Sequence, residues 1–384
     1  MDFQFSDELK AIKLAVREFI EKEVHPRESI IEEEDRIPEE LVESARKLGL
    51  FGSSIPEEYG GLGLNMIGKC AIGEEMGRGI AGFAGFLGAH TGIGTSGIVM
   101  QGSEYLKQKY LPDMAEGRKI GAFALTEPDA GSDASNLKTT AVKKGDRWIL
   151  NGTKHFITNG PIADVVTTMA VTDPSRGPRG ISAFVVESTF PGYRTGKNER
   201  KMGLKGCYTS EIIFEDCEVP EENMLGEENR GFVTALMILA KGRAGLGAGS
   251  VGACRRLIEL STKYAKERVQ FGKPIAENQA IQWMLADMVT ETEAARTLTL
   301  QTAWKADKGM NVIRDAAMTK LFASETYCRV ADRAVQIHGG MGYMKEMPIE
   351  RIYRDSRITR LYEGTSEVQR MVIAATLLKD GLQY

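Results

Sequence analysis

The stretch RWILNGTKHFITNGPIADVVTTMAV, residues 147–171, is where the hydrophobic pattern of the chain changes its period. Its runs of β-branched and aromatic residues are short, and turn-forming pairs such as Asn151-Gly152 and Asn159-Gly160 separate them. Similar runs occupy residues 181–186 and 212–214. No amphipathic helix is predicted between these runs, so they indicate a small antiparallel sheet and not a series of β-α-β units.

The sequence on both sides of this region has a helical period. From residue 5 to about 117, apolar residues recur at three- and four-residue steps, as in Leu9, Ile12, Val16 and Phe19. Beyond residue 231 the helical stripes are longer. One consists of Ile281, Met284, Leu285, Met288, Ala295 and Leu298, and another of Ala317, Leu321, Ser324, Cys328, Ala331 and Val335. We therefore predict an α+β fold with an amino-terminal helical domain (1–119), a middle antiparallel β-domain (120–230) and a carboxyl-terminal domain like a four-helix bundle (231–384).

Composition excludes several classes of protein. The 384 residues carry a net charge of -4, so there is no electrostatic footprint for nucleic acid. The five cysteines form no CxxC pair and the four histidines do not cluster with them, so we predict no metal site and reduced thiols. No apolar run reaches the ~18 residues that a membrane span needs. The acidic start of the chain does not resemble a signal peptide, so we expect a cytoplasmic protein, or one in an organelle matrix if a targeting segment was removed.

One glycine pattern invites a nicotinamide-dependent interpretation. Residues 247–252 (GAGSVG) match the dinucleotide-binding fingerprint, but that motif needs a preceding strand and an acidic residue about 20 positions later. Here a helix is predicted before it, and residues 269–275 contain no acid. We interpret these small residues as a close helix contact. The motifs GxSxG, HExxH and GxxxxGK[ST] do not occur.

Four segments have residues suited to a chemical role. Residues 125–133 (LTEPDAGSD) would expose backbone N–H groups that can bind a phosphate or the edge of a ring, as any polar turn might also do without a ligand. Residues 154–160 (KHFITNG) place Phe156 and Thr158 two apart, on one face of a strand and suited to a flat ring. Residues 336–343 (QIHGGMGY) could form a helix C-cap. Residues 361–370 (LYEGTSEVQR) contain Glu363 just before a predicted helix, where it could be only a cap.

Together, in this order, these segments resemble the acyl-CoA dehydrogenase family along nearly the whole chain. Residues 56–61 (PEEYGG) and 268–273 (RVQFGK) belong to the same resemblance. It implies an FAD cofactor, an acyl-CoA substrate, an electron-transfer flavoprotein as partner and a homo-oligomer, commonly a tetramer built as a dimer of dimers, in which some flavin contacts cross between subunits.

The resemblance also implies which residues bind. Thr158 would lie near flavin N5 and Phe156 would cover the ring, where most members of the family have tryptophan; Phe156 can still stack, but it lacks the indole N–H. The cofactor-binding residues would be Phe123, Leu125, Thr126, Gly131, Ser132, Phe156, Thr158, Arg268, Phe271, Gln279, Gln336, Gly340, Thr365 and Glu367. The substrate-binding residues would be Ser132, Arg243 and Gly364.

The implied reaction is dehydrogenation to the trans-2-enoyl-CoA, with Glu363 taking the α-proton and flavin N5 the β-hydride. A carboxylate buried beside an acyl chain should have a raised pKa, which suits proton abstraction. The Glu363 backbone N–H would stabilise charge at the thioester oxygen. Residues 240–245 around Arg243, where some branches of the family have their base, contain no carboxylate.

Other functions stay open at this point. An acyl-CoA oxidase would return the electrons to oxygen, and a specialised dehydrogenase would take branched or cyclic acyl groups. A non-catalytic acyl-CoA or flavin-binding scaffold and a nicotinamide reductase are further alternatives. Chain length would depend on the pocket floor, which we expect between Leu87 and Thr95. No basic cluster stands ready for a second carboxylate, which disfavours a dicarboxylyl-CoA.

Overall fold

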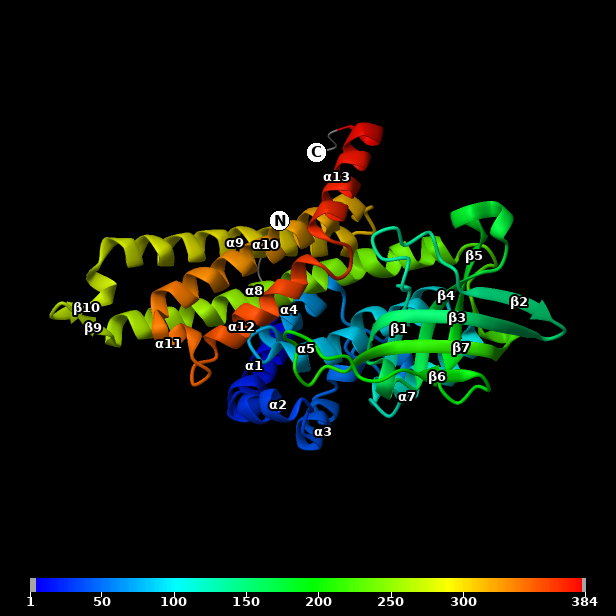
Figure 1. The fold of residues 1–384 in the computed structure, drawn as a ribbon, viewed down its shortest axis with the longest axis horizontal. Helices are drawn as coiled ribbons and strands as arrows, with labels where there is room; N and C mark the ends of the chain where they lie inside the picture. Colours follow the sequence, from blue (N-terminus) through cyan, green and yellow to red (C-terminus); the bar gives the residue numbers. More distant parts are fainter. Residues whose placement is uncertain (1–4, 382–384) are drawn as a thin grey trace.

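The computed structural model describes residues 5–381, with helices at both ends of the chain and a sheet in the middle (Figure 1). The predicted α+β fold class is confirmed. The amino-terminal helices form around a core that contains Phe19, Phe51, Phe83 and Phe86. They are α1 (Asp7–Phe19), α2 (Glu28–Glu34), α3 (Glu39–Lys47), α4 (Met66–Met76), α5 (Ala81–Gly88), α6 (Ser96–Gln101) and α7 (Glu104–Ala115). Between α5 and α6 lies the π-helical segment η5 (Ala89–Gly94).

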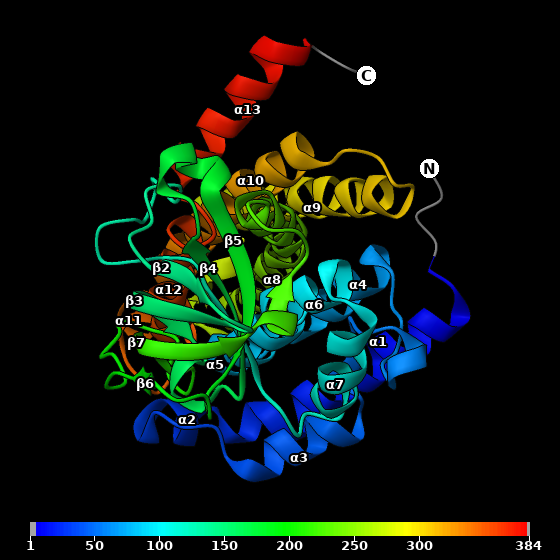
Figure 2. The same cartoon turned by 90° about the vertical axis from the view of Figure 1, so that its right-hand side faces the viewer.

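The middle region is a sheet that is mainly antiparallel, as predicted. Its strands are β1 (Gly121–Ala124), β2 (Thr140–Lys144), β3 (Arg147–Thr158), β4 (Val165–Val171), β5 (Ile181–Glu187), β6 (Tyr193–Thr195), β7 (Thr209–Pro220) and β8 (Met224–Leu225). Their order is β6-β7-β3-β2-β4-β5-β8, and the short β1 pairs in parallel with β4. The sheet lies beside the amino-terminal helices and the start of α8 (Gly231–Glu267) (Figure 2). Helices and strands thus cover both faces of β4 and β5, which are buried along almost their whole length.

Strand β3 departs from the regular alternation that we predicted for residues 154–160. Lys154 pairs with Ile212 and Ile157 with Ser210, so β3 has one residue more than β7 over this interval. Phe156 takes up the extra residue with a φ of 57°. This bulge places Lys154 and Ile157 in the interior and leaves Phe156 62% exposed. The flat ring of Phe156 is therefore presented by a bulge and not by a regular strand.

The carboxyl-terminal region is built from three long helices, α8, α9 (Gln279–Asp307) and α10 (Ile313–His338), which pack side by side (Figure 1). Shorter helices follow: α11 (Gly340–Tyr343), α12 (Ile349–Ser356) and α13 (Ser366–Asp380). A small hairpin of β9 (Val269–Gln270) and β10 (Lys273–Pro274) joins α8 to α9. Helix α13 packs on α10 at its start and then projects away from the rest of the molecule (Figure 2).

The glycine-rich run 247–252 lies inside α8, as predicted, and it is not a nucleotide-binding turn. A methyl group added to Gly252 would lie 1.9 Å from the carbonyl oxygen of Glu74, and one added to Gly77 would lie 2.1 Å from that of Gly249. Helices α8 and α4 therefore touch backbone to backbone. These glycines allow that approach because they have no Cβ.

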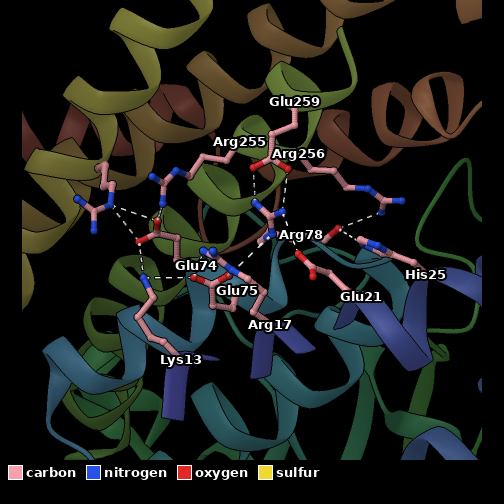
Figure 3. Close-up of polar contacts among 11 residues, drawn as sticks. Lys13, Arg17, Glu21, His25, Glu74, Glu75, Arg78, Arg255, Arg256 and Glu259 are labelled. Carbon is pink, nitrogen blue, oxygen red and sulfur yellow. Dashed lines mark hydrogen bonds and ion pairs between the residues drawn. The ribbon is translucent and has the colours of Figure 1, made fainter. Parts of the chain in front are cut away.

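Ion pairs also join α8 to the amino-terminal helices (Figure 3). Arg78 Nη2 lies 2.7 Å from Glu259 Oε2. The buried Glu28 carboxylate accepts hydrogen bonds from Arg256 and, at 2.7 Å, from Arg351 of α12. These contacts join sequence positions 181 to 323 apart and hold the second half of α8 against the amino-terminal helices and α12. Within residues 5–381 no helix has both the length and the apolar character needed to cross a bilayer.

Candidate active site

Glu363 lies in the short turn that precedes α13. Its φ of 53° falls in the left-handed region, which is uncommon for a residue with a side chain, and Gly364 follows with a φ of 90°. The cap of α13 is the hydroxyl of Thr365, which accepts a hydrogen bond from the Val368 N–H at 3.3 Å. The carboxylate of Glu363 is therefore not needed as a helix cap.

Three side chains hold the backbone of this turn. Arg243 Nε, from α8, donates to the carbonyl oxygen of Glu363 at 3.2 Å. Gln369 Nε2, from α13, donates to the same oxygen at 3.0 Å and to that of Gly364 at 2.9 Å. Lys320 Nζ, from α10, donates to the Gly364 oxygen at 2.7 Å. Three helices thus stabilise a strained backbone conformation at the residue that carries the carboxylate.

Glu363 is half-buried as a residue, and its carboxylate lies against α8. Its Oε2 atom is buried and has no hydrogen-bond partner within residues 5–381. A methyl group at Gly242 would come within 2.7 Å of Oε2 and 3.2 Å of Ile93, so the carboxylate occupies space that the glycine leaves free beside η5. Burial raises the pKa of Glu363 to about 7, and the charges of Arg243 and Lys320 oppose that rise. A buried, unpartnered carboxylate that ionises near neutral pH is well suited to general-base chemistry.

The loop at residues 125–132 is anchored to β3 through its acidic residue. Lys154 Nζ, completely buried, lies 2.7 Å from Glu127 Oε1, and the same carboxylate accepts the backbone N–H groups of Lys138 and Thr139. The His155 N–H donates to the Thr126 carbonyl at 2.8 Å. The loop is therefore fixed in place even though its outer edge is exposed.

The predicted cofactor residues on this loop differ in exposure. The side chains of Phe123 and Leu125 are buried in the core beneath the loop, so only their main chain is available to a ligand. Gly131 and Ser132 are exposed. No hydrogen bond to the N–H of either residue is formed within the described part of the chain. On β3, Phe156 is exposed and Thr158 is half-buried. No hydrogen bond or ion pair among residues 5–381 joins Phe156 or Thr158 to Glu363.

The remaining predicted residues lie in two places. Thr365 and Glu367 adjoin Glu363 at the start of α13. The others lie around the β9–β10 hairpin and the end of α10, at the opposite end of the molecule from the sheet (Figure 1): Arg268, Phe271, Gln279, Gln336 and Gly340. Along α8, Arg268 is 25 residues from Arg243, which corresponds to roughly 37 Å of helix. Within one chain, the predicted cofactor residues around the hairpin and the end of α10 therefore lie far from those near Glu363.

Arg243 and the glycines after α10 each have a structural role in this chain. The guanidinium of Arg243, for which we predicted a contact with CoA, is buried against the main chain of Glu363, with 6% of the residue exposed. A CoA contact from the same side chain stays a prediction. Gly339 ends α10 with a φ of 57°, and its N–H bonds to Val335 and Gln336, so this glycine pair does form a helix end.

Sequence reasoning missed three residues of the site: Gly242, Lys320 and Gln369. Gln369 lies within the segment 361–370 that drew attention to Glu363, but nothing in the segment indicates that it folds back on the turn. The sequence around Lys320 does indicate that this residue is unusual. It is a lysine next to Leu321 in the stripe of small and apolar residues on α10, and a charged residue at such a position is rarely buried without a role.

Comparison with known proteins supports the family resemblance. Models described as the N-terminal, middle and C-terminal domains of acyl-CoA dehydrogenase match residues 6–118, 122–217 and 229–378. An acyl-CoA dehydrogenase of Bacillus subtilis (strain 168) is 47% identical over 363 residues, which cover 94% of this chain and 96% of the relative. The chain belongs to the acyl-CoA dehydrogenase family. It is an oxidoreductase of that type, and its cofactor is FAD.

The chain is also similar to further proteins, which have different names. Subunit CarC of the caffeyl-CoA reductase-Etf complex of Acetobacterium woodii is 45% identical and covers 98% of this chain and 99% of its own. The butyryl-CoA dehydrogenase structure from Megasphaera elsdenii has a TM-score of 0.95 at 42% identity, covering 98% of this chain and 100% of that one. The acyl-CoA dehydrogenase from Bacillus anthracis, solved with FAD, has a TM-score of 0.92 at 40% identity, covering 98% and 68%.

The residues of this chain fit a flavin. A flat ring needs an aromatic surface and hydrogen-bond donors at its edge. Phe156 offers an exposed ring on the bulge of β3. Gly131 and Ser132 offer N–H groups without protein partners, and no atom lies within 4 Å of the Cβ position of Gly131, so its backbone is open to a close approach. The acyl-CoA dehydrogenase cofactor therefore has a suitable surface on this chain.

Proposed function

We propose that this protein removes one hydrogen from each of the α and β carbons of an acyl-CoA thioester, with Glu363 as the base. The observation that carries the proposal is the Glu363 carboxylate: its Oε2 atom is buried without a hydrogen-bond partner within residues 5–381, and its pKa is raised to about 7. A carboxylate that served only structure would be expected to have a partner, since an unpartnered buried group costs free energy.

The protein's own groups account for the proton transfer. Glu363 Oε2 accepts the α-proton, and the resulting neutral carboxylic acid suits its buried surroundings better than the anion does. Arg243 and Gln369 hold the Glu363 carbonyl, so the side chain starts from a fixed backbone. The N–H of Glu363 has no partner within residues 5–381 and is available to the thioester oxygen, where negative charge develops. FAD, when bound, supplies the acceptor for the β-hydride.

The base is tested with Glu363→Gln. This variant should keep FAD and still bind acyl-CoA, because the amide has nearly the same shape as the carboxylate. The rate at which acyl-CoA bleaches the flavin should fall at least about 100-fold, the usual size of a general-base contribution. Bleaching at the wild-type rate in single-turnover stopped flow would show that Glu363 is not the base.

Substrate class is tested with a panel of CoA esters. Ile93 of η5 lies next to the space occupied by the Glu363 carboxylate, and no atom lies within 4 Å of the Cβ positions of Gly88 and Gly92. His90 does not line this space, because it is buried and its ring bonds to Gly121 and Met114. We propose that residues 88–94 set acyl-chain length. Flavin bleaching by straight-chain esters of increasing length, and by branched and cyclic esters, tests activity and specificity together.

We propose an electron-transfer flavoprotein as the partner. Similarity to a subunit of a caffeyl-CoA reductase-Etf complex supports such a partner. Oxygen is the acceptor in the competing oxidase hypothesis. Stopped-flow reoxidation of the substrate-reduced enzyme by air and by an electron-transfer flavoprotein distinguishes the two: fast reoxidation by air alone would favour the oxidase.

We also propose a homo-oligomer, expected to be a tetramer, whose flavin site is completed by a neighbouring subunit. The proposal is supported by the separation between Arg243 and the hairpin that carries Arg268, and by Phe271, which is fully exposed at the tip of that hairpin. A large aromatic side chain in that position is normally covered by a ligand or a partner. Light scattering coupled to size-exclusion chromatography measures the mass, and a monomer that retains FAD tightly would contradict the proposal.

A further inference from the structure

Lys320 is a buried lysine next to the proposed base. It lies on α10 with no part of the residue exposed to solvent. No carboxylate within residues 5–381 forms an ion pair with it, and its one hydrogen bond goes to the carbonyl oxygen of Gly364, at 2.7 Å. A buried ammonium group without an ion-pair partner is costly, so its presence calls for an explanation beyond packing.

The neighbouring acidic groups do not neutralise Lys320 directly. Glu325, one turn along α10, is engaged by Ser366 at 2.8 Å and by Arg360 at 3.0 Å. Glu367 is exposed at the start of α13. Glu363 is the acidic group whose charge acts most strongly on Lys320, and among residues 5–381 Arg243 is the other charged group that acts on both.

We infer that Lys320 is a positioning residue for Glu363, which fixes the turn through the Gly364 carbonyl and supplies the positive charge that keeps the buried carboxylate able to ionise. The inference rests on the proposed function of Glu363 as the base. The geometry supports the inference, because the ammonium group bonds to the carbonyl of the residue that follows Glu363 and so lies beside the turn that carries the carboxylate. Its positive charge accordingly opposes the rise in the pKa of Glu363. Burial lowers the pKa of Lys320 to about 8, so the group is still mainly charged near neutral pH.

The role follows from the balance of effects on Glu363. Burial raises the pKa of this carboxyl group to about 7, against the charges of Arg243 and Lys320. If one of these two charges is removed, the pKa should rise further. The carboxylate would then be protonated at neutral pH and could not accept the substrate's proton. An opposite charge within about 4–6 Å typically changes the pKa of a carboxyl group by about one unit or more.

The test is the pH dependence of flavin bleaching by butyryl-CoA, or by the most active ester of the panel, in single-turnover stopped flow. Lys320→Gln replaces the charge with an uncharged hydrogen-bond donor. The acid limb of its profile should move up by about one pH unit, which lowers the rate at pH 7 about fivefold. Lys320→Arg keeps a charge, and its acid limb should stay where it is in the wild-type protein. Lys320→Met should lose both the charge and the Gly364 contact. Its acid limb should move up as far as that of Lys320→Gln, and its maximal rate should also be lower.

A matched control is Lys305→Met. Lys305 of α9 forms an ion pair with Asp315 in the first turn of α10, so this variant disturbs the same helix without facing Glu363. It should lower thermal stability and leave the acid limb unmoved. If the role of Lys320 were purely structural, Lys320→Gln would behave like Lys305→Met, with lower thermal stability and an unmoved acid limb. An acid limb of Lys320→Gln that coincides with the wild-type limb would therefore overturn the inference.

A second readout does not depend on turnover. The infrared C=O stretch of a protonated carboxyl group that disappears in Glu363→Gln reports ionisation of Glu363 directly, and its titration midpoint should be higher in Lys320→Gln than in the wild type. The two proposals fail in different ways. If Glu363→Gln is active, the proposal that Glu363 is the base is wrong. If Glu363→Gln is inactive but the acid limb of Lys320→Gln does not shift, only the proposed role of Lys320 is wrong.

Discussion

Gly242 of α8 gives the Glu363 carboxylate its room, because a hydrogen atom stands where any other residue would have a Cβ. In Gly242→Ala the added methyl would lie 2.7 Å from Oε2, so the carboxylate must move. Displacements of about 1 Å in a catalytic group can cost on the order of 100-fold in rate. We expect flavin bleaching to slow at least tenfold with FAD content unchanged.

The control for this prediction is Gly245→Ala, three residues along the same helix. No atom lies within 4 Å of its Cβ position. Alanine favours a helix over glycine by up to about 1 kcal/mol, so this variant should be at least as stable as the wild type and as active. Equal bleaching rates for the two variants would show that the space at Gly242 does not matter to the base.

Glu363 should also make stability depend on pH. Its pKa in the folded protein, about 7, lies above the ordinary value of 4.5, so the folded state binds the proton more tightly than the unfolded state does. Glu363 therefore does not lower the free energy of unfolding below pH 4.5, where it is protonated in both states. Above pH 7, where it is ionised, it lowers the free energy of unfolding by its full amount. Glu363→Gln should melt about 2 °C higher than the wild type at pH 8 and at nearly the same temperature at pH 5. Melting curves with excess FAD measure this, and a constant difference at both pH values would contradict it.

At the scale of secondary-structure elements, the loop at 125–132 depends on a buried ion pair with β3. Lys154 is fully buried, and burial lowers its pKa to about 8, against the opposing effect of Glu127. Lys154→Met removes the cation and leaves the Glu127 carboxylate buried with only backbone donors. Breaking such a pair typically costs 3–5 kcal/mol. We expect a lower melting temperature and an FAD dissociation constant raised about tenfold or more, measured by flavin fluorescence.

Lys143→Met is the matched control for the loop prediction. Lys143 lies on β2 of the same sheet and pairs with Glu221, but both side chains are about half exposed. Exposed pairs contribute about 0–1 kcal/mol, so FAD affinity should not change. If both variants retained FAD equally well, the buried pair would not be what fixes the loop.

At the scale of the whole molecule, Glu28 joins the amino-terminal helices to the carboxyl-terminal ones. Although burial raises the pKa of Glu28, its hydrogen bond and charge interactions with Arg256, and the charge of Arg351, lower it overall. The stability that this pairing gives is therefore present above about pH 4.5 and lost as pH falls below it. Glu28→Gln leaves two buried guanidinium groups without a counter-charge, which typically costs 3–5 kcal/mol.

We expect Glu28→Gln to melt several degrees below the wild type at pH 7, with a smaller difference at pH 4. Differential scanning calorimetry at both pH values measures it. Glu18→Gln, which breaks the exposed pair with Lys22 at the end of α1, should change the melting temperature by less than about 1 °C. A Glu28 variant that behaved like the Glu18 variant would show that the buried network does not hold the two regions together.

The sequence by itself determined the order of helices and sheet, because hydrophobic periodicity is a local property that each segment carries with it. It also led to the proposal for Glu363, but only through the resemblance of residues 361–370 and the other motifs to the acyl-CoA dehydrogenase family, because the segment by itself is equally typical of a helix cap. The sequence also identifies the glycines of α8 as a helix contact, because the strand that a nucleotide-binding fingerprint requires is absent from the neighbouring sequence.

The tertiary structure alone decided what surrounds the carboxylate. Arg243, Lys320 and Gln369 meet at one turn although they lie 49 to 126 positions apart from one another, and packing of α8, α10 and α13 brings them there. The bulge at Phe156 likewise depends on how β3 pairs with β7, which no local pattern specifies. Burial, which sets the pKa of Glu363, exists only once these elements have packed, because desolvation is a property of the whole environment and not of the residue.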